Sequence, residues 1–207
     1  MRLKKTDLKL SLLGIVTLCG LFIMPLVANT FLKWWTHTSY SSDVIAPLFT
    51  EQVQHWAPQI EQWSSVYGID PNLMATIMQI ESCGHPTVVS NAGARGLFQV
   101  MPFHFDADED MLDPNVNALR SANFINECHG YASGDIGLIL ACYNGGPSVT
   151  YRAFDGWPDE TKRYYVWGLT IYQDAVLFSD NSAHLDDWLS AGGVHLCNQA
   201  SSALQLR

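Results

Sequence analysis

Glu81 is the residue whose type and position most favour catalysis, because it ends a stretch of apolar residues at helical spacing. The stretch opens with Asp70 and Pro71, a pair typical of a helix N-terminus. A carboxyl at the other end of this helix would face the negative end of the helix dipole, and apolar neighbours would remove it from water. Both effects raise the pKa of a glutamate. A carboxyl that stays protonated near neutral pH is suited to general acid catalysis on a glycosidic bond.

Two later stretches also place polar residues at expected helix ends. One runs from Ala141 to Pro147 and holds Tyr143 and Asn144 after an apolar helix, and the other runs from Trp157 to Val166 and holds Glu160. Each residue has a structural interpretation when it is taken alone. Glu81 could be an exposed acid of a last helical turn, Tyr143 a core residue, Asn144 a helix cap and Glu160 an acid that stabilises a helix dipole.

Taken together, the three stretches resemble the soluble lytic transglycosylases. Residues 81–102 resemble the family pattern E-S-x-x-x-P-x-x-x-S-x-x-G-A-x-G-L-x-Q-x-M-P. The later two resemble A-Y-N-x-G-P, with Cys142 where a small apolar residue is usual, and P-x-E-T-x-x-Y-V. The resemblance extends from about Pro58 to about Tyr172. It implies a mainly α, goose-type lysozyme-like domain that cleaves peptidoglycan glycan strands.

The resemblance also implies the roles of individual residues. Glu81 would protonate the bond between N-acetylmuramic acid and N-acetylglucosamine and then act as base, so that the muramyl 6-hydroxyl closes a 1,6-anhydro ring in place of water. Other residues at family positions for holding the glycan or supporting the acid are Ser82, Ser90, Gln99, Met101, Tyr143, Asn144, Glu160 and Tyr164, with Tyr165 as an alternative to Tyr164. The family implies neither a cofactor nor a metal.

Two other functions remain open at this point. A lysozyme- or chitinase-like hydrolase of the same fold would need a second carboxylate to place a water, and Asp106, Asp108 and Asp110 are candidates. A non-catalytic glycan-binding module is the other alternative, although retention of Glu81 argues against it. The acidic run that holds these aspartates lacks the spacing of an EF-hand loop, so we expect a solvated loop there and no metal site.

The N-terminus carries an uncharged apolar run over residues 10–28, preceded by basic residues. As a helix it would span roughly 28 Å, close to the thickness of a bilayer core. We expect residues 1–30 to anchor the protein with its N-terminus in the cytoplasm, and a cleaved signal peptide is the alternative. A tether at 31–43, a lysozyme-like domain at 44–178 and a helical extension at 179–207 would follow. This extension should pack on the outside of the domain. The lysozyme-like domain and its extension should both lie outside the bacterial cytoplasm.

The charge indicates which kinds of partner to expect, and the cysteines indicate the compartment. Residues 34–207 carry 6 basic and 19 acidic residues, a formal charge of −13, which argues against nucleic acid binding. No protein partner is indicated. Four cysteines lie in this part and predict two disulfides in an oxidising compartment, with three pairings open. The resemblance places Cys83 and Cys142 around one cleft, which favours Cys83–Cys142 with Cys128–Cys197.

Overall fold

The computed structural model describes residues 44–206, which are mainly helical, as the sequence predicts. The α-helices are α2 (Glu51–Gln54), α3 (Ala57–Tyr67), α4 (Pro71–Glu81), α5 (Pro114–Ala132), α6 (Ile136–Gly145), α7 (Asp159–Val176), α8 (Ala183–Trp188) and α9 (Val194–Leu204). Short 3-10 turns are η1 (Pro102–His104), η2 (Pro147–Tyr151) and η3 (Phe154–Gly156). Within these residues, β-structure is limited to isolated bridges that join Arg95 to Val89 and to Val100.

The expected membrane anchor at residues 10–28 and the tether at 31–43 lie outside the described residues. Among the helices from residue 44 onward, none combines the length and the apolar character that crossing a membrane requires.

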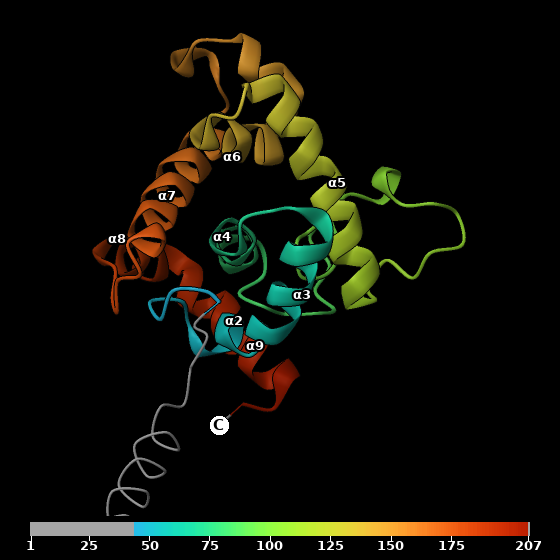
Figure 1. Ribbon diagram of the computed structural model, residues 1–207, viewed down its shortest axis with the longest axis vertical. Helices are drawn as coiled ribbons and strands as arrows, with labels where there is room; N and C mark the ends of the chain where they lie inside the picture. Colours follow the sequence, from blue (N-terminus) through green and yellow to red (C-terminus); the bar gives the residue numbers. More distant parts are fainter. Residues whose placement is uncertain (1–43, 207) are drawn as a thin grey trace, which may run out of the picture. The chain divides into compact units, whose positions relative to one another are not determined.

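Helix α4 lies at the centre of the fold. Figure 1 shows it nearly end-on, with α5, α6 and α7 in an arc around it. Its side chains are almost all buried, including Leu73, Met74, Ile77 and Met78. Because neighbours surround α4 on most sides, the position of its last residue, Glu81, is fixed by packing rather than by helix propensity alone.

Aspartates begin three of the helices, as the sequence indicates from Asp70-Pro71, Asp113-Pro114 and Ser133-Gly134-Asp135. The Asp70 carboxylate accepts a hydrogen bond from Leu73 N (3.0 Å), and Asp113 and Asp135 do the same for α5 and α6. The sequence predicts that the helix after Asp113-Pro114 starts at about Asn115 and ends at about Cys128. Helix α5 starts there as expected, at Pro114, but continues one turn beyond Cys128, because Ala132 still packs into the core.

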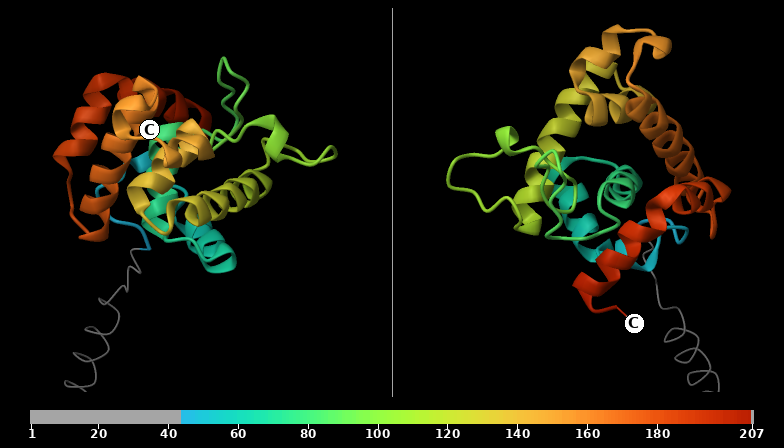
Figure 2. Two further views of the ribbon diagram at one scale, coloured as in Figure 1. Left: turned by 90° about the horizontal axis from the view of Figure 1, so that it is seen from above. Right: turned by 180° about the vertical axis from the view of Figure 1, so that it is seen from behind.

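The segment between α4 and α5 extends away from the helices (Figure 2), but its base is held firmly. Leu97 and Phe98 are fully buried. The Asn117 side chain of α5 accepts a hydrogen bond from Phe98 N (2.9 Å) and donates to the carbonyls of Arg95 (2.8 Å) and Met111 (3.0 Å). A Cβ on residue 96 would lie 2.8 Å from Asn117 Nδ2, so this close approach requires Gly96.

The C-terminal extension differs from the prediction. Ser182 caps α8 by accepting a hydrogen bond from Leu185 N (3.1 Å). The sequence predicts that the helix with Leu185, Trp188 and Leu189 ends at Gly192 and Gly193, but the chain only kinks over residues 189–193 and then forms α9. Helix α9 is joined to α2 by a hydrogen bond of 2.6 Å from Gln52 Nε2 to Ser201 Oγ.

The predicted disulfide pairing is wrong. The structure pairs Cys83 with Cys197 and Cys128 with Cys142, at Cα–Cα distances of 5.0 and 5.7 Å. Helices α5 and α6 are consecutive and pack against each other, which brings Cys128 opposite Cys142. The pairing implied by the resemblance did not take α9 into account. Cys197 of this helix is the partner of Cys83, two residues after Glu81.

Candidate active site

The C-terminal end of α4 borders a pocket of about 290 Å³. Four elements of the fold line this pocket, namely α4, α6, α7 and α8. Its lining residues are Ile80, Glu81, Asn144, Glu160, Arg163, Tyr164, Trp167 and Trp188. The structure thus brings four residues singled out from the sequence, Glu81, Asn144, Glu160 and Tyr164, into one cavity from three separate motifs.

The surroundings of Glu81 favour its protonated form. Desolvation by the packed helix ends raises the pKa of the carboxyl from 4.5 to about 8, and the negative charge of Glu160 acts in the same direction. The nearby Tyr164 hydroxyl works against this rise by stabilising the carboxylate. Desolvation is the largest of these effects, so Glu81 holds a proton at neutral pH. It can therefore donate this proton to a group bound in the pocket.

Tyr164 is the tyrosine of the third motif that faces the pocket, whereas Tyr165 packs against Trp157 at a ring separation of 5.4 Å. The two adjacent residues point to different sides of α7 because successive helical residues are about 100° apart. The Tyr164 hydroxyl is buried, and within the described chain it forms no hydrogen bond of correct geometry. A buried hydroxyl without a partner is costly, so this group is available to a ligand or to a reoriented Glu81.

Tyr143 and Asn144 take different positions at the end of α6. Tyr143 does not line the pocket but is buried, and its hydroxyl donates to Phe98 O (2.8 Å) and lies 3.0 Å from Ser121 Oγ. Asn144 reaches the pocket itself. Its Oδ1 accepts a hydrogen bond from Thr161 Oγ1 (2.8 Å), which leaves the amide NH₂ group free to donate.

Four residues predicted from the first motif do not line the pocket. Ser82 is fully buried, and its hydroxyl donates to Leu97 O (2.6 Å), so it fixes the end of α4. Ser90 accepts a hydrogen bond from Ala94 N (3.0 Å), and Gln99 Nε2 donates to Gly96 O (3.0 Å). These two side chains shape the loop after α4. Met101 precedes η1 and is partly buried.

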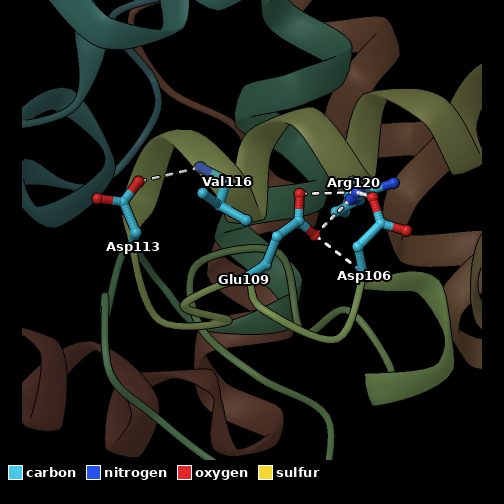
Figure 3. A network of polar contacts seen from close by, with 5 residues as sticks. All are labelled: Asp106, Glu109, Asp113, Val116 and Arg120. Carbon is cyan, nitrogen blue, oxygen red and sulfur yellow. Dashed lines mark hydrogen bonds and ion pairs between the residues drawn. The ribbon is translucent and has the colours of Figure 1, made fainter.

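The acidic run after η1 also lies outside the pocket. Figure 3 shows that Asp106 and Glu109 both bind the Arg120 guanidinium, with Glu109 Oε2 at 2.7 Å from Arg120 Nε. This pairing lowers the pKa of Glu109. None of these acids is among the residues that line the pocket. Across residues 44–206, no group of three or more metal-ligating side chains is placed to bind an ion.

Comparison with known proteins agrees with this arrangement of motifs. The profile of the Transglycosylase SLT domain family matches residues 58–166, which is just over half of the chain. The chain belongs to the SLT transglycosylase family. The matched SLT segment contains Glu81, Asn144, Glu160 and Tyr164.

Individual relatives of this SLT chain come from a phage and from bacteria. A protein named transglycosylase from Enterobacteria phage PRD1 is 32% identical over 53% of this chain and 40% of its own length. A membrane-bound lytic murein transglycosylase C of Glaesserella parasuis is 39% identical over 58% of this chain and 38% of its own length. An endo-type membrane-bound lytic murein transglycosylase A of Klebsiella pneumoniae is 42% identical over 25% of this chain and 26% of its own length. The SLT chain thus matches at most 40% of the length of these three relatives.

Sequence reasoning missed four of the residues that line the pocket: Ile80, Arg163, Trp167 and Trp188. Helical spacing could have found Trp167, which lies seven residues after Glu160 and three after Tyr164 on one face of α7. Trp188 carries no local signal. It lies beyond the SLT segment, in the extension that we expected to remain on the outside of the domain, and that expectation is wrong for this residue.

Proposed function

We propose that the protein is a peptidoglycan lytic transglycosylase in which Glu81 is the catalytic acid and base. The observation that carries the proposal is a desolvated carboxyl with a pKa of about 8, at the motif position of an SLT chain and inside a pocket. The names of the relatives support murein as the substrate class. The substrate would be the β-1,4 bond between N-acetylmuramic acid and N-acetylglucosamine.

In the proposed reaction Glu81 first gives its proton to the glycosidic oxygen, and the bond from this oxygen to muramyl C1 breaks. Positive charge develops on the muramyl ring, where its N-acetyl group can stabilise it. The Glu81 carboxylate then takes the proton from the muramyl 6-hydroxyl, whose oxygen bonds to C1. This tethered hydroxyl has a high effective molarity compared with water. Asn144, Glu160 and Tyr164 would hold the sugars or orient Glu81.

A hydrolase is the second candidate function. One observation favours a second carboxylate other than the aspartates suggested by the sequence. Hydrolysis needs a second carboxylate near the bond. The acids at 106–110 lie away from the pocket, but Glu160 lines it and influences the pKa of Glu81. In a hydrolase, Glu160 would therefore be the residue that activates water.

Mass spectrometry of digested glycan strands separates the two reactions. A transglycosylase releases fragments that are lighter than hydrolysis products by one water, about 18 mass units, and that resist borohydride, because an internal ether replaces the hydrolytic step. Glu81→Gln should lower the cleavage rate at least about 100-fold. Glu160→Gln should keep the anhydro product at a reduced rate. Borohydride-reducible muramic ends from the parent protein, lost in Glu160→Gln, would instead establish a hydrolase.

The proposed location is the bacterial cell envelope, with the catalytic domain outside the cytoplasm. Two disulfides in the described residues support this, since such bonds persist in oxidising compartments. Two of the relatives are named as membrane-bound, which supports residues 10–28 as an anchor. Resistance of the full-length protein to salt and carbonate extraction from membranes is the expected result. A soluble protein that begins near Thr30 would instead identify a cleaved signal peptide.

A further inference from the structure

The tryptophans of the described chain differ in whether their indole N–H has a partner. Residues 44–206 contain five of them. Three donate from Nε1 to an acceptor of the described chain, namely Trp56 to Gly84 O (2.9 Å), Trp63 to Asn115 Oδ1 (3.0 Å) and Trp157 to Val149 O (2.9 Å). Trp167 and Trp188 donate to no acceptor within residues 44–206, and these are the two tryptophans that line the Glu81 pocket.

Both pocket tryptophans are held in place by the fold. Trp188 is only 4% exposed, and Gly193 packs directly against its ring, since a Cβ there would lie 2.4 Å away. Trp167 packs partly into the core and lies on the same face of α7 as Tyr164. A tryptophan N–H that is withdrawn from water usually finds a partner. In these two side chains the partner is therefore expected to come from a ligand.

Another donor lies in the same pocket. The Asn144 NH₂ group is available because its Oδ1 accepts the hydrogen bond from Thr161 Oγ1 (2.8 Å). Trp167 belongs to α7 and Trp188 to α8, and these two helices pack against each other (Figure 1). The pocket thus combines N–H donors from α6, α7 and α8 with the apolar faces of two indole rings.

An acetamido group has the complementary chemistry. Its carbonyl oxygen accepts hydrogen bonds, and its methyl group gains from burial against an apolar surface. Both sugars of the proposed substrate carry an acetamido group at C2. A hydroxyl at the same position has neither the carbonyl oxygen nor the methyl group, so it would match this pocket less well.

We propose that Trp167 and Trp188 recognise an acetamido group of the bound glycan. Their indole N–H groups donate to its carbonyl oxygen, and their rings contact its methyl group. The inference rests on the proposed function, because it names what the same pocket selects in a glycan. Both tryptophans lie beyond residues 58–166, the segment that the family profile matches. The selection is therefore a property of this chain that the matched segment does not supply.

The test compares two neutral β-1,4-linked tetrasaccharides, one of N-acetylglucosamine and one of glucose, which has a hydroxyl in place of each acetamido group. Both are titrated by calorimetry into the full-length chain carrying Glu81→Gln, so that neither is cleaved. The N-acetylglucosamine tetramer should bind at least about tenfold more tightly, because hydrogen bonds and a buried methyl group are added. Adding Trp188→Phe keeps an aromatic ring but removes the N–H. It should weaken binding of this tetramer about three- to tenfold and leave binding of the glucose tetramer within about twofold.

Trp167→Phe should have the same selective effect and provides a second, independent variant. Trp63→Phe is the matched control. It makes the same chemical change in α3, where the lost hydrogen bond joins Trp63 to the exposed Asn115, and it should leave both affinities unchanged.

Equal affinity for the two tetramers, or no binding of the N-acetylglucosamine tetramer at millimolar concentration, would overturn the inference. So would Trp188→Phe and Trp167→Phe variants that weaken both tetramers equally or weaken neither. These results would leave the proposed function intact, because that function is tested by the products that the parent protein releases from glycan strands.

Discussion

Replacing Glu81 with glutamine should stabilise the protein at neutral pH and have little effect in acid. The pKa of Glu81 is raised from 4.5 to about 8 in the folded protein. Between these values the folded state binds a proton that the unfolded state has released, so stability falls as pH rises from about 4.5 to about 8. Glutamine keeps the shape of the side chain and has no proton to lose. The variant therefore escapes this loss of stability.

The magnitude follows from the two pKa values. At pH 7 the unfolded Glu81 lies about 2.5 pH units above its pKa, while the folded group is still mostly protonated. At about 1.4 kcal/mol per unit this difference is roughly 3 kcal/mol. Glu81 is partly exposed, and solvation of the carboxylate reduces the expected gain in the free energy of unfolding to about 2 kcal/mol. At pH 4 the same calculation gives less than about 0.3 kcal/mol.

Urea unfolding of parent and variant at pH 4 and pH 7, with the disulfides intact, measures this difference. A gain of about 2 kcal/mol should raise the midpoint by about 1 M urea at pH 7. Glu61→Gln makes the same chemical change at an exposed position of α3 and should stay within about 0.5 kcal/mol of the parent at both pH values. Equal stability of parent and Glu81→Gln at pH 7, or the same difference at both pH values, would refute the reasoning.

Four further outcomes are expected. The cleavage rate should fall about tenfold per pH unit above pH 8, as Glu81 loses the proton that it must donate, and a rate profile over pH 5–10 measures this. Asn117→Ala should lower the free energy of unfolding by about 2–4 kcal/mol in urea titrations, because it removes one buried and two partly buried hydrogen bonds to the loop after α4. Gly193→Ala should cost about 1–3 kcal/mol and raise KM, since its Cβ would lie 2.4 Å from the Trp188 ring. Gly130→Ala, which meets open space on α5, should instead stabilise by about 0.5–1 kcal/mol.

Local chemistry made the helix ends and the acid predictable. Asp70 and Pro71 specify the start of α4, and apolar residues at helical spacing extend it to Glu81. These signals depend only on residues within a few turns of one another. The same holds for Asp135 and the buried helix α6, and for the apolar residues of α7.

The disulfides and the last wall of the pocket depend on contacts between distant parts of the chain. Cys83 and Cys197 are 114 residues apart, and nothing near either cysteine specifies the other. Trp188 reaches the pocket because α8 packs against α7. Ser82 shows that a motif position does not by itself predict where a side chain points. Its place beside the acid in the motif suggested a substrate contact, but burial turns its hydroxyl toward Leu97 O.

The disulfide between Cys83 and Cys197 also sets an order of events during synthesis. The ribosome delivers Glu81 and Cys83 more than a hundred residues before the partner cysteine, whereas Cys128 and Cys142 are only 14 residues apart and can pair as soon as α6 has emerged. Glu81 is thus present long before Trp188 completes the pocket. The native partner of Cys83 is therefore missing until α9 is made, and Trp188 can join the pocket only after nearly all of the chain has been translated.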